Sequence, residues 1–208
     1  EEPFAEEFTK QLVGAVSHLP CGDPKDPKTF IGPVINDRQV QDIDALVKDA
    51  VAKGAKLLTG GTYEGRVYAP TVLKDITPDM RIYHEETFGP VISLYRFTDE
   101  ADAIARANQG EYGLNASIYS RDTKRARAIA KRIKCGTVNV NEAFAATFAS
   151  IDAPMGGMRE SGQGRRQGAE GLLRYTETQA VAVQRLLRFG PSFGLKDKTF
   201  ANVMTANL

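Results

Sequence analysis

The sequence predicts an α/β fold, in which a mostly parallel sheet carries helices on both faces. Two observations lead to this class. Segments with a helical spacing of apolar residues alternate with short β-branched runs along most of the 208 residues, which is typical of βαβ units. Hydrophobic residues make up 42% of the chain and charged residues 25%, so the sequence can bury a core of ordinary size.

Two helices are predicted in the first quarter of the chain. Apolar residues at four-residue intervals indicate the first helix, namely Phe4, Phe8, Leu12 and Val16. A loop rich in breaker residues follows at 22–27. A second apolar stripe indicates the next helix, namely Val40, Ile43, Val47 and Val51. Asn36 and Asp37 are both candidate N-caps of this helix, and Gly54 lies near its end.

Strands and two further helices account for most of the remaining chain. β-rich runs predict strands at residues 56–59, 72–73, 91–97, 116–119, 137–141 and 180–183. Helical spacing predicts one helix at about residues 100–108 and another around Ala126, Ile129, Ala130 and Ile133. The stretch beyond Phe189 has no clear period, so we expect it to form a docked arm or a partly disordered tail.

The composition excludes several classes of protein. The 27 basic and 26 acidic residues give a net charge of +1, which provides no electrostatic footprint for nucleic acid. No apolar run approaches the ~20 residues that a membrane helix requires. Cys21 and Cys135 are too few for a disulfide framework, and they share no metal-ligand spacing with the two histidines. We expect a cytoplasmic protein without a metal site, a membrane span or a nucleic-acid partner.

The segment His84–Val91 (HEETFGPV) is the most informative part of the sequence. Two adjacent carboxylates precede an aromatic residue, a glycine, a proline and a β-rich run. An acid before a strand could hold a sugar hydroxyl, and an aromatic residue two positions later would point the same way in an extended stretch. The alternative interpretation is a charged turn that caps a strand. The residues of this segment leave both interpretations open.

Together with its flanking motifs, this segment resembles the C-terminal part of the catalytic domain of the aldehyde dehydrogenase superfamily. The motifs that carry the resemblance occur in the same order as in that family, and they lie at residues 69–73 (APTVL), 84–91, 112–114 (YGL), 154–157 (PMGG) and 161–165 (SGQGR). The resemblance implies a catalytic-domain fragment at 1–175, a late strand for oligomerisation at 176–188 and a C-terminal tail at 189–208.

The resemblance also implies a function. Such an enzyme uses NAD or NADP to oxidise an aldehyde to a carboxylic acid through a cysteine thioester. Cys21 and Cys135 do not match the family's nucleophile motif, so we expect no catalytic residue in this chain. The nucleophile and the Rossmann-like region would lie upstream of Glu1. The 208-residue chain alone is then expected to be inactive, and the full-length protein is expected to form a homodimer or homotetramer.

Individual site residues follow from the same resemblance. Glu86 matches the carboxylate that holds the nicotinamide ribose, and Phe88 matches the aromatic residue beside that nucleotide, whereas Glu85 is expected to brace the loop. Residues 141–150 occupy the position of the family's substrate loop and resemble the succinate-semialdehyde branch. The candidate substrate residues in this loop are Phe144, Thr147, Phe148 and Ser150. Core packing on a helical turn is the alternative role for the two phenylalanines.

Two further stretches admit other interpretations. The glycine-rich residues 156–168 contain neither dinucleotide fingerprint, so they predict a loop in which glycines permit positive φ angles and close backbone approach. Residues 180–184 could pair with a neighbouring subunit by strand addition. The competing hypothesis for the chain as a whole is therefore a non-catalytic assembly module.

Overall fold

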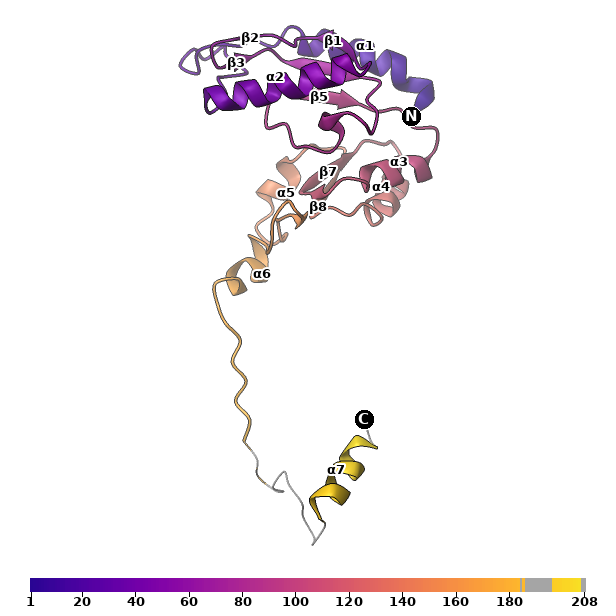
Figure 1. Cartoon of the computed structure of the whole chain (residues 1–208), viewed down its shortest axis with the longest axis vertical. Coiled ribbons are helices and arrows are strands. Elements are labelled where there is room, and N and C mark those ends of the chain that lie inside the picture. Colours follow the sequence, from indigo (N-terminus) through magenta and orange to yellow (C-terminus); the bar gives the residue numbers. More distant parts are fainter. Residues whose placement is uncertain (184, 186–195, 207–208) are drawn as a thin grey trace. The chain divides into compact units, whose positions relative to one another are not determined.

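The computed structural model of the chain describes residues 1–183, 185 and 196–206. The chain divides into one unit of Glu1–Leu172 and a second unit of Leu173–Leu208. Helices and strands alternate through the first unit (Figure 1), which confirms the predicted α/β class. Within the described residues, no helix is both long and apolar enough to cross a membrane.

A three-stranded sheet organises the first half of the larger unit. Its strands are β1 (Lys56–Thr59), β4 (Thr71–Lys74) and β5 (Val91–Leu94), in the order β1-β4-β5. β4 and β5 are parallel, whereas β1 runs antiparallel to β4. A hairpin of β2 (Tyr63–Glu64) and β3 (Val67–Tyr68) connects β1 to β4.

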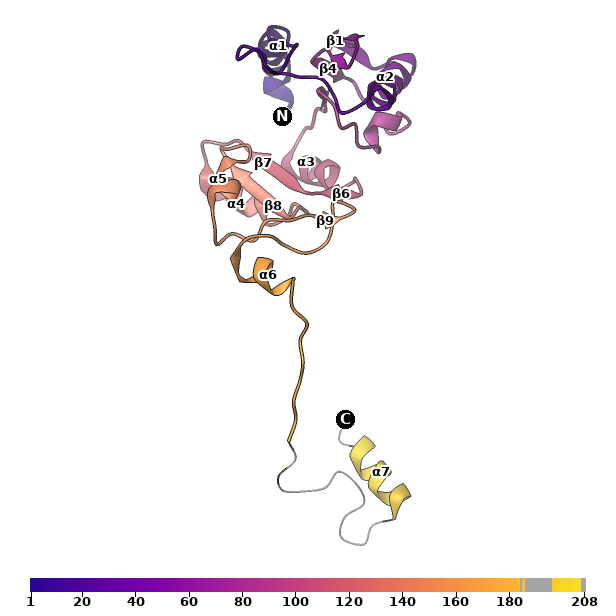
Figure 2. The ribbon, with the colours of Figure 1, turned by 90° about the vertical axis from the view of Figure 1, so that its left-hand side faces the viewer.

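The two predicted N-terminal helices are present and lie on opposite faces of this sheet (Figures 1 and 2). They are α1 (Ala5–Val16), which follows a short 3-10 turn at Glu2–Phe4, and α2 (Asp37–Ala52). Asn36 is the N-cap of α2, because its side-chain oxygen accepts the backbone N–H of Gln39 at 2.8 Å. The prediction of helices on both faces is therefore confirmed for this sheet.

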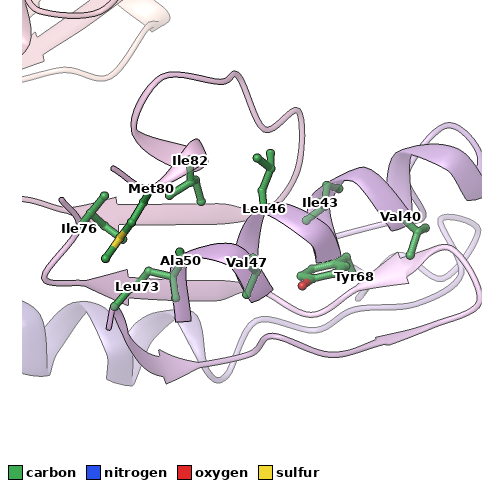
Figure 3. Packing of buried hydrophobic residues seen from close by; sticks show 11 residues of the cluster. Val40, Ile43, Leu46, Val47, Ala50, Tyr68, Leu73, Ile76, Met80 and Ile82 are labelled. Atoms are coloured by element: carbon green, nitrogen blue, oxygen red, sulfur yellow. The ribbon is translucent and has the colours of Figure 1, made fainter. Parts of the chain in front are cut away.

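The main hydrophobic core lies between α2 and the sheet. Figure 3 shows Ile43, Val47 and Ala50 projecting from α2 toward Tyr68 and Leu73. The complete cluster of buried residues is Val40, Ile43, Leu46, Val47, Ala50, Ala55, Tyr68, Leu73, Ile76, Met80 and Ile82. The four-residue stripe that predicted α2 from the sequence is thus the stripe that α2 buries, with the exception of its last member, Val51, which is exposed.

A second parallel pair of strands forms in the other half of this unit. β7 (Asn115–Ile118) pairs with β8 (Thr137–Val140). Helix α3 (Glu100–Ala107) precedes β7, and helix α4 (Thr123–Ala130) connects β7 to β8; Asp99 and Asp122 are their N-caps. A short helix, α5 (Ala145–Ala149), follows β8. Parallel pairing is therefore confined to β4–β5 and β7–β8 among the described strands.

The glycine-rich stretch is a close-packed connection, as predicted. It contains β9 (Met158–Arg159), which pairs antiparallel with β6 (Tyr112–Gly113), and it ends at α6 (Gly168–Leu173). Gly162 and Gly164 have positive φ angles of 114° and 77°. A Cβ atom on Gly136 would lie 1.6 Å from the carbonyl oxygen of Gly156, so only glycine allows β8 to approach this stretch so closely.

In the smaller unit, the described part of the predicted late strand is unpaired, and the predicted tail contains a helix. Residues 176–183 form neither helix nor strand, and the predicted strand at 180–183 has no pairing partner within the described residues. The rest of the predicted late strand, apart from residue 185, lies outside them. The predicted tail contains α7 (Asp197–Thr205), a helix that the lack of a clear sequence period did not indicate.

Candidate functional site

The segment His84–Val91 forms the loop that leads into β5. It follows the 3-10 helix η2 (Arg81–Tyr83) and ends where β5 begins at Val91. The backbone N–H of Thr71 donates to the carbonyl oxygen of Pro90 at 2.8 Å. The end of the loop is therefore fixed to β4 before the parallel ladder of β4 and β5 starts.

The two adjacent glutamates of the loop have different environments. The Glu85 carboxylate accepts two hydrogen bonds from the Arg81 guanidinium, at 2.7 Å from Nε and 2.8 Å from Nη2. These bonds lower the pKa of Glu85. The Glu86 side chain is exposed and forms no ion pair or hydrogen bond within the described residues. Glu85 thus braces the loop, as predicted, and Glu86 leaves a carboxylate available.

Phe88 is exposed and is not part of the core. Its exposed fraction is 72%, so the ring does not pack into the core that residues 1–172 form. Its φ angle is +44°, a left-handed conformation that is uncommon for a residue with a large side chain. Such strained conformations are concentrated at functional sites. An exposed aromatic ring and an unpaired carboxylate therefore lie two residues apart on a constrained loop.

Helix α2 contacts this loop at two points. The side-chain amide of Gln39 donates to the carbonyl oxygen of Thr87 at 3.0 Å. Gly89 lies against Ile43, and a Cβ atom on Gly89 would come within 2.4 Å of the Ile43 Cδ1 atom. The Gln39 side chain therefore binds the backbone of the loop that carries Glu86 and Phe88.

The arrangement of Glu86 and Phe88 fits the ribose of a nicotinamide nucleotide. A free carboxylate can accept both hydroxyl hydrogens of a vicinal diol in charge-assisted hydrogen bonds. An exposed phenyl ring offers an apolar face to the sugar or to the base beside it. Neither side chain is committed to another described residue, so the residues present fit such a group.

The second candidate group lies on α5 and on the residues flanking it. The rings of Phe144 and Phe148 pack with centroids 5.3 Å apart. Both side chains remain partly open, with exposed fractions of 42% and 52%. Arg166 lies above the Phe148 ring, 5.9 Å from its centroid. Phe144 and Phe148 thus pack on one another, as a helical turn allows, and still present apolar surface.

The two hydroxyl residues of this loop differ in their partners. Thr147 Oγ1 donates to Asn139 Oδ1 at 2.6 Å, so its hydrogen is committed within the chain. The Ser150 hydroxyl forms no hydrogen bond within the described residues, although Ser150 is only half-buried. Ser150 therefore remains available to a polar ligand group, whereas Thr147 offers only an oxygen lone pair.

The structure does not join these two groups directly. Within residues 1–172, no hydrogen bond, ion pair or ring contact links Glu86 or Phe88 to the substrate-loop candidates Phe144, Thr147, Phe148 and Ser150. Arg166 was not proposed from the sequence as a site residue. The glycine-rich stretch also contains Arg159 and Arg165, so no signal in the sequence distinguished Arg166 as the arginine beside Phe148.

The two cysteines have the properties of non-catalytic residues. Cys135 is buried, and Cys21 is exposed on a loop. Local desolvation raises the pKa of the Cys21 thiol, whereas a nucleophilic cysteine requires a lowered pKa. Within the described residues there is also no cluster of three or more side chains that could hold a metal ion.

Comparisons with known proteins give a consistent result. A model described as the aldehyde dehydrogenase family matches residues 1–181. A protein of Mycobacterium tuberculosis (strain ATCC 25618 / H37Rv), provisionally named succinate-semialdehyde dehydrogenase NADP(+) 2, is 43% identical over 199 residues. This match covers 94% of the present chain and 38% of the relative. The chain therefore spans less than half the length of that relative.

Solved structures are similar over most of the chain. Succinate-semialdehyde dehydrogenase from Burkholderia pseudomallei superimposes with a TM-score of 0.77 at 36% identity, covering 83% of this chain and 36% of that one. Betaine aldehyde dehydrogenase from Staphylococcus aureus in complex with NAD+ gives a TM-score of 0.79 at 34% identity, covering 84% and 36%. At these identities the likeness extends beyond the general fold.

Proposed function

The chain belongs to the aldehyde dehydrogenase family, and we propose that it forms the C-terminal part of the catalytic domain of an NAD(P)-dependent enzyme. That enzyme would oxidise an aldehyde to a carboxylic acid through a cysteine thioester. The observation that carries this proposal is that one loop, held by the Arg81–Glu85 ion pair, presents both the Glu86 carboxylate without a described partner and the exposed Phe88 ring. The nucleophilic cysteine is assigned to the part of the enzyme upstream of Glu1, since neither Cys21 nor Cys135 has an activating environment.

Glu86 and Phe88 position the nucleotide in this proposal. The nicotinamide, when bound, supplies the electron acceptor for the oxidation. Glu86 accepts the two ribose hydroxyls, and the Phe88 ring limits how far the sugar can shift. The Arg81–Glu85 pair and the Gln39–Thr87 bond hold the loop backbone, so that only the Glu86 side chain has to be ordered when the nucleotide arrives. The choice between NAD and NADP depends on residues that contact the adenosine end.

Succinate semialdehyde is the aldehyde that we favour. Relatives with this name match most of the chain, and one of the similar solved structures also carries it. Phe144 and Phe148 would form an apolar wall for the short carbon chain, and Ser150 would donate its free hydroxyl to a polar group. Arg166, which lies over the Phe148 ring and forms no ion pair within the described residues, adds a cation that suits a substrate with a distal carboxylate.

Activity of the full-length protein tests this proposal. The protein would be assayed with NAD and NADP against succinate semialdehyde and against an uncharged aldehyde of the same chain length, by following formation of the reduced nucleotide. We expect turnover with at least one nucleotide and a higher kcat/KM for the charged aldehyde. Turnover of neither aldehyde would reject the enzymatic assignment. Turnover by the isolated 208-residue chain would show that the nucleophile had been assigned to the wrong part of the protein.

A role in assembly is the second candidate function. It is favoured by the exposure of Val181 and Val183, whose exposed fractions are 82% and 72% in a segment without pairing partners among the described residues. A strand from another subunit would cover this apolar segment. We propose that the full-length enzyme is a homodimer or homotetramer in the cytoplasm, where two free cysteines fit a reducing environment. Its mass in solution, measured by light scattering, tests the oligomeric state.

A further inference from the structure

The carbonyl oxygen of Ala143 is the acceptor of three side-chain hydrogen bonds. Asn115 Nδ2 donates at 3.0 Å, Ser117 Oγ at 2.8 Å and Asn139 Nδ2 at 3.2 Å. A carbonyl oxygen has two lone pairs, so three donors saturate it. Ala143 is the residue immediately before Phe144. The entry into the substrate loop is therefore fixed to the sheet at one backbone atom.

Asn139 extends this anchor to a second point of the loop. Its side-chain oxygen accepts the hydroxyl of Thr147 at 2.6 Å, while its amide nitrogen donates both to Ala143 and to Asn115 Oδ1, the latter at 2.9 Å. Asn139 is buried, with an exposed fraction of 4%. One buried amide thus binds the loop on both sides of Phe144, and it holds the turn that sets Phe144 against Phe148.

The parallel pairing of β7 and β8 produces this cluster. Asn115 is the register partner of Thr137, and Ser117 is the register partner of Asn139. Alternate residues of a strand face the same side, so these side chains lie together on one face of the pair. Thr137 Oγ1 also donates to Asn115 Oδ1, at 2.8 Å. Thr137 and Asn139 are buried on this face, whereas Asn115 and Ser117 are exposed. Buried polar side chains are costly unless they are hydrogen-bonded, and both of these are.

We propose that Asn139 is a positioning residue for aldehyde selection, and that Thr147 acts through Asn139 rather than on the substrate. The inference rests on the proposed function of the Phe144–Phe148 wall. Asn139 and Thr147 fix the turn from which the two rings project, and the separation of the rings from the rest of the site sets which aldehydes fit. The hydroxyl hydrogen of Thr147 points to Asn139 Oδ1, so it is not available to a substrate oxygen.

Two substitutions in the full-length protein, made singly and together, test this inference. Thr147→Val removes the hydroxyl at nearly constant volume, and Asn139→Ala removes its partner. Thr147→Ser keeps the hydroxyl and should behave like the unsubstituted protein. Thr9→Val is the matched control, because Thr9 Oγ1 donates to the Ala5 carbonyl within α1, far in sequence from the loop. For each variant, kcat and KM are measured for succinate semialdehyde, for longer uncharged aldehydes and for the nucleotide.

We expect Thr147→Val to raise the KM for succinate semialdehyde about threefold to tenfold, the loss of one hydrogen bond between neutral groups. The KM for the nucleotide should stay within about twofold of its original value, and the preference among aldehydes should weaken. In the Asn139→Ala background, Thr147→Val should have little further effect, because the bond is already absent.

Three results would overturn the inference. The first is an unchanged aldehyde KM in Thr147→Val. The second is full additivity of Thr147→Val and Asn139→Ala, which would mean that Thr147 contacts the substrate independently. The third is an equal change in the KM for the nucleotide, which would indicate a general loss of structure. A full-length protein without any aldehyde oxidation would reject the proposed function and this inference together, whereas the three results above reject the inference alone.

Discussion

The Arg81 guanidinium holds the Glu85 carboxylate through two parallel hydrogen bonds of 2.7 and 2.8 Å, and the next residue along the chain is Glu86, which has no such partner among the described residues. The bidentate pair spans the 3-10 helix and the start of the loop. It lowers the pKa of Glu85, so this carboxylate keeps its charge to a lower pH than an isolated glutamate does. One acid therefore maintains the loop while its neighbour remains free to bind.

The pH dependence of stability should reveal this pair. Because the pKa of Glu85 is lowered by folding, the carboxylate contributes stability above its ordinary pKa of 4.5, and that contribution is lost as the pH falls through the lowered value. The melting temperature of Glu85→Gln in the full-length protein should lie slightly below that of the unsubstituted protein at neutral pH. The two should converge in acid and in high salt, because both side chains are about half exposed. A difference that grew in acid would contradict this reading.

Glu86→Gln should weaken nucleotide binding in the full-length enzyme. The loss of charge-assisted bonds to two hydroxyls should cost about 1.5–3 kcal/mol of binding free energy, seen as a higher KM or Kd for NAD or NADP. The KM for the aldehyde should change little. Glu111→Gln, which removes an exposed carboxylate outside the loop, is the matched control. Equal nucleotide affinity in Glu86→Gln and Glu111→Gln would exclude Glu86 from the site.

Phe88→Ala should separate binding from stability. The side chain is 72% exposed, so its removal should change the free energy of unfolding by less than about 0.5 kcal/mol. The KM for the nucleotide should nevertheless rise, because the ring no longer limits the position of the ribose. Chemical denaturation and steady-state kinetics on the same preparation measure both quantities. A large loss of stability with an unchanged KM would mean that Phe88 has a structural role.

Gly89→Ala should destabilise the protein through Ile43. The new methyl group would lie 2.4 Å from Ile43 Cδ1, and Ile43 is fully buried between α2 and the sheet. Overpacking of this kind costs about 1–3 kcal/mol. Ile43→Val removes Cδ1, the nearer of the two clashing atoms, and leaves Cγ1, which would lie at 2.8 Å, so the double variant should recover part of the lost stability. If the changes in the free energy of unfolding caused by Ile43→Val and Gly89→Ala were additive in the double variant, the contact with Ile43 would not explain the destabilisation by Gly89→Ala.

Asn36→Ala should destabilise helix α2 by about 1 kcal/mol, because it removes the side-chain oxygen that accepts the Gln39 N–H. Asn36→Asp keeps an oxygen at this position and should retain most of the stability. Since Gln39 also holds Thr87, fraying at this end of α2 should raise the KM for the nucleotide modestly. Thermal unfolding and nucleotide kinetics check the two effects, and equal stability of the Ala and Asp variants would contradict the cap.

The sequence predicted the helices and strands that are determined by neighbouring residues, such as a helix cap or an apolar stripe. The cap at Asn36 and the apolar stripe from Val40 to Val47 defined α2, and short apolar or β-branched runs located β1, β4, β5, β7 and β8. The hairpin Tyr63–Tyr68 was missed because strands of two residues show no alternation. Helix α6 was missed because its glycines disfavour a helix, and α7 because no cap or apolar stripe marks it.

The candidate site was predictable only where its residues lie close together in the sequence. The resemblance of residues 84–91 to a family motif singled out Glu86 and Phe88 as candidates, and the i,i+4 spacing of Arg81 and Glu85 favours an ion pair. The Gln39–Thr87 bond joins residues 48 positions apart, so no local pattern reveals it. For the same reason the sequence identified Thr147 as a hydroxyl in the loop, and only the structure showed that its hydrogen points to Asn139.

The three hydrogen bonds to the Ala143 carbonyl oxygen have an evolutionary consequence. The three donors bind a main-chain oxygen, and every amino acid supplies that atom. Substitutions of Phe144 and Phe148 therefore leave these three hydrogen bonds to the Ala143 carbonyl in place. Under the proposed function, substitutions at Phe144 and Phe148 would change aldehyde selection while the turn stays anchored, so directed evolution of the full-length enzyme should begin at these two positions.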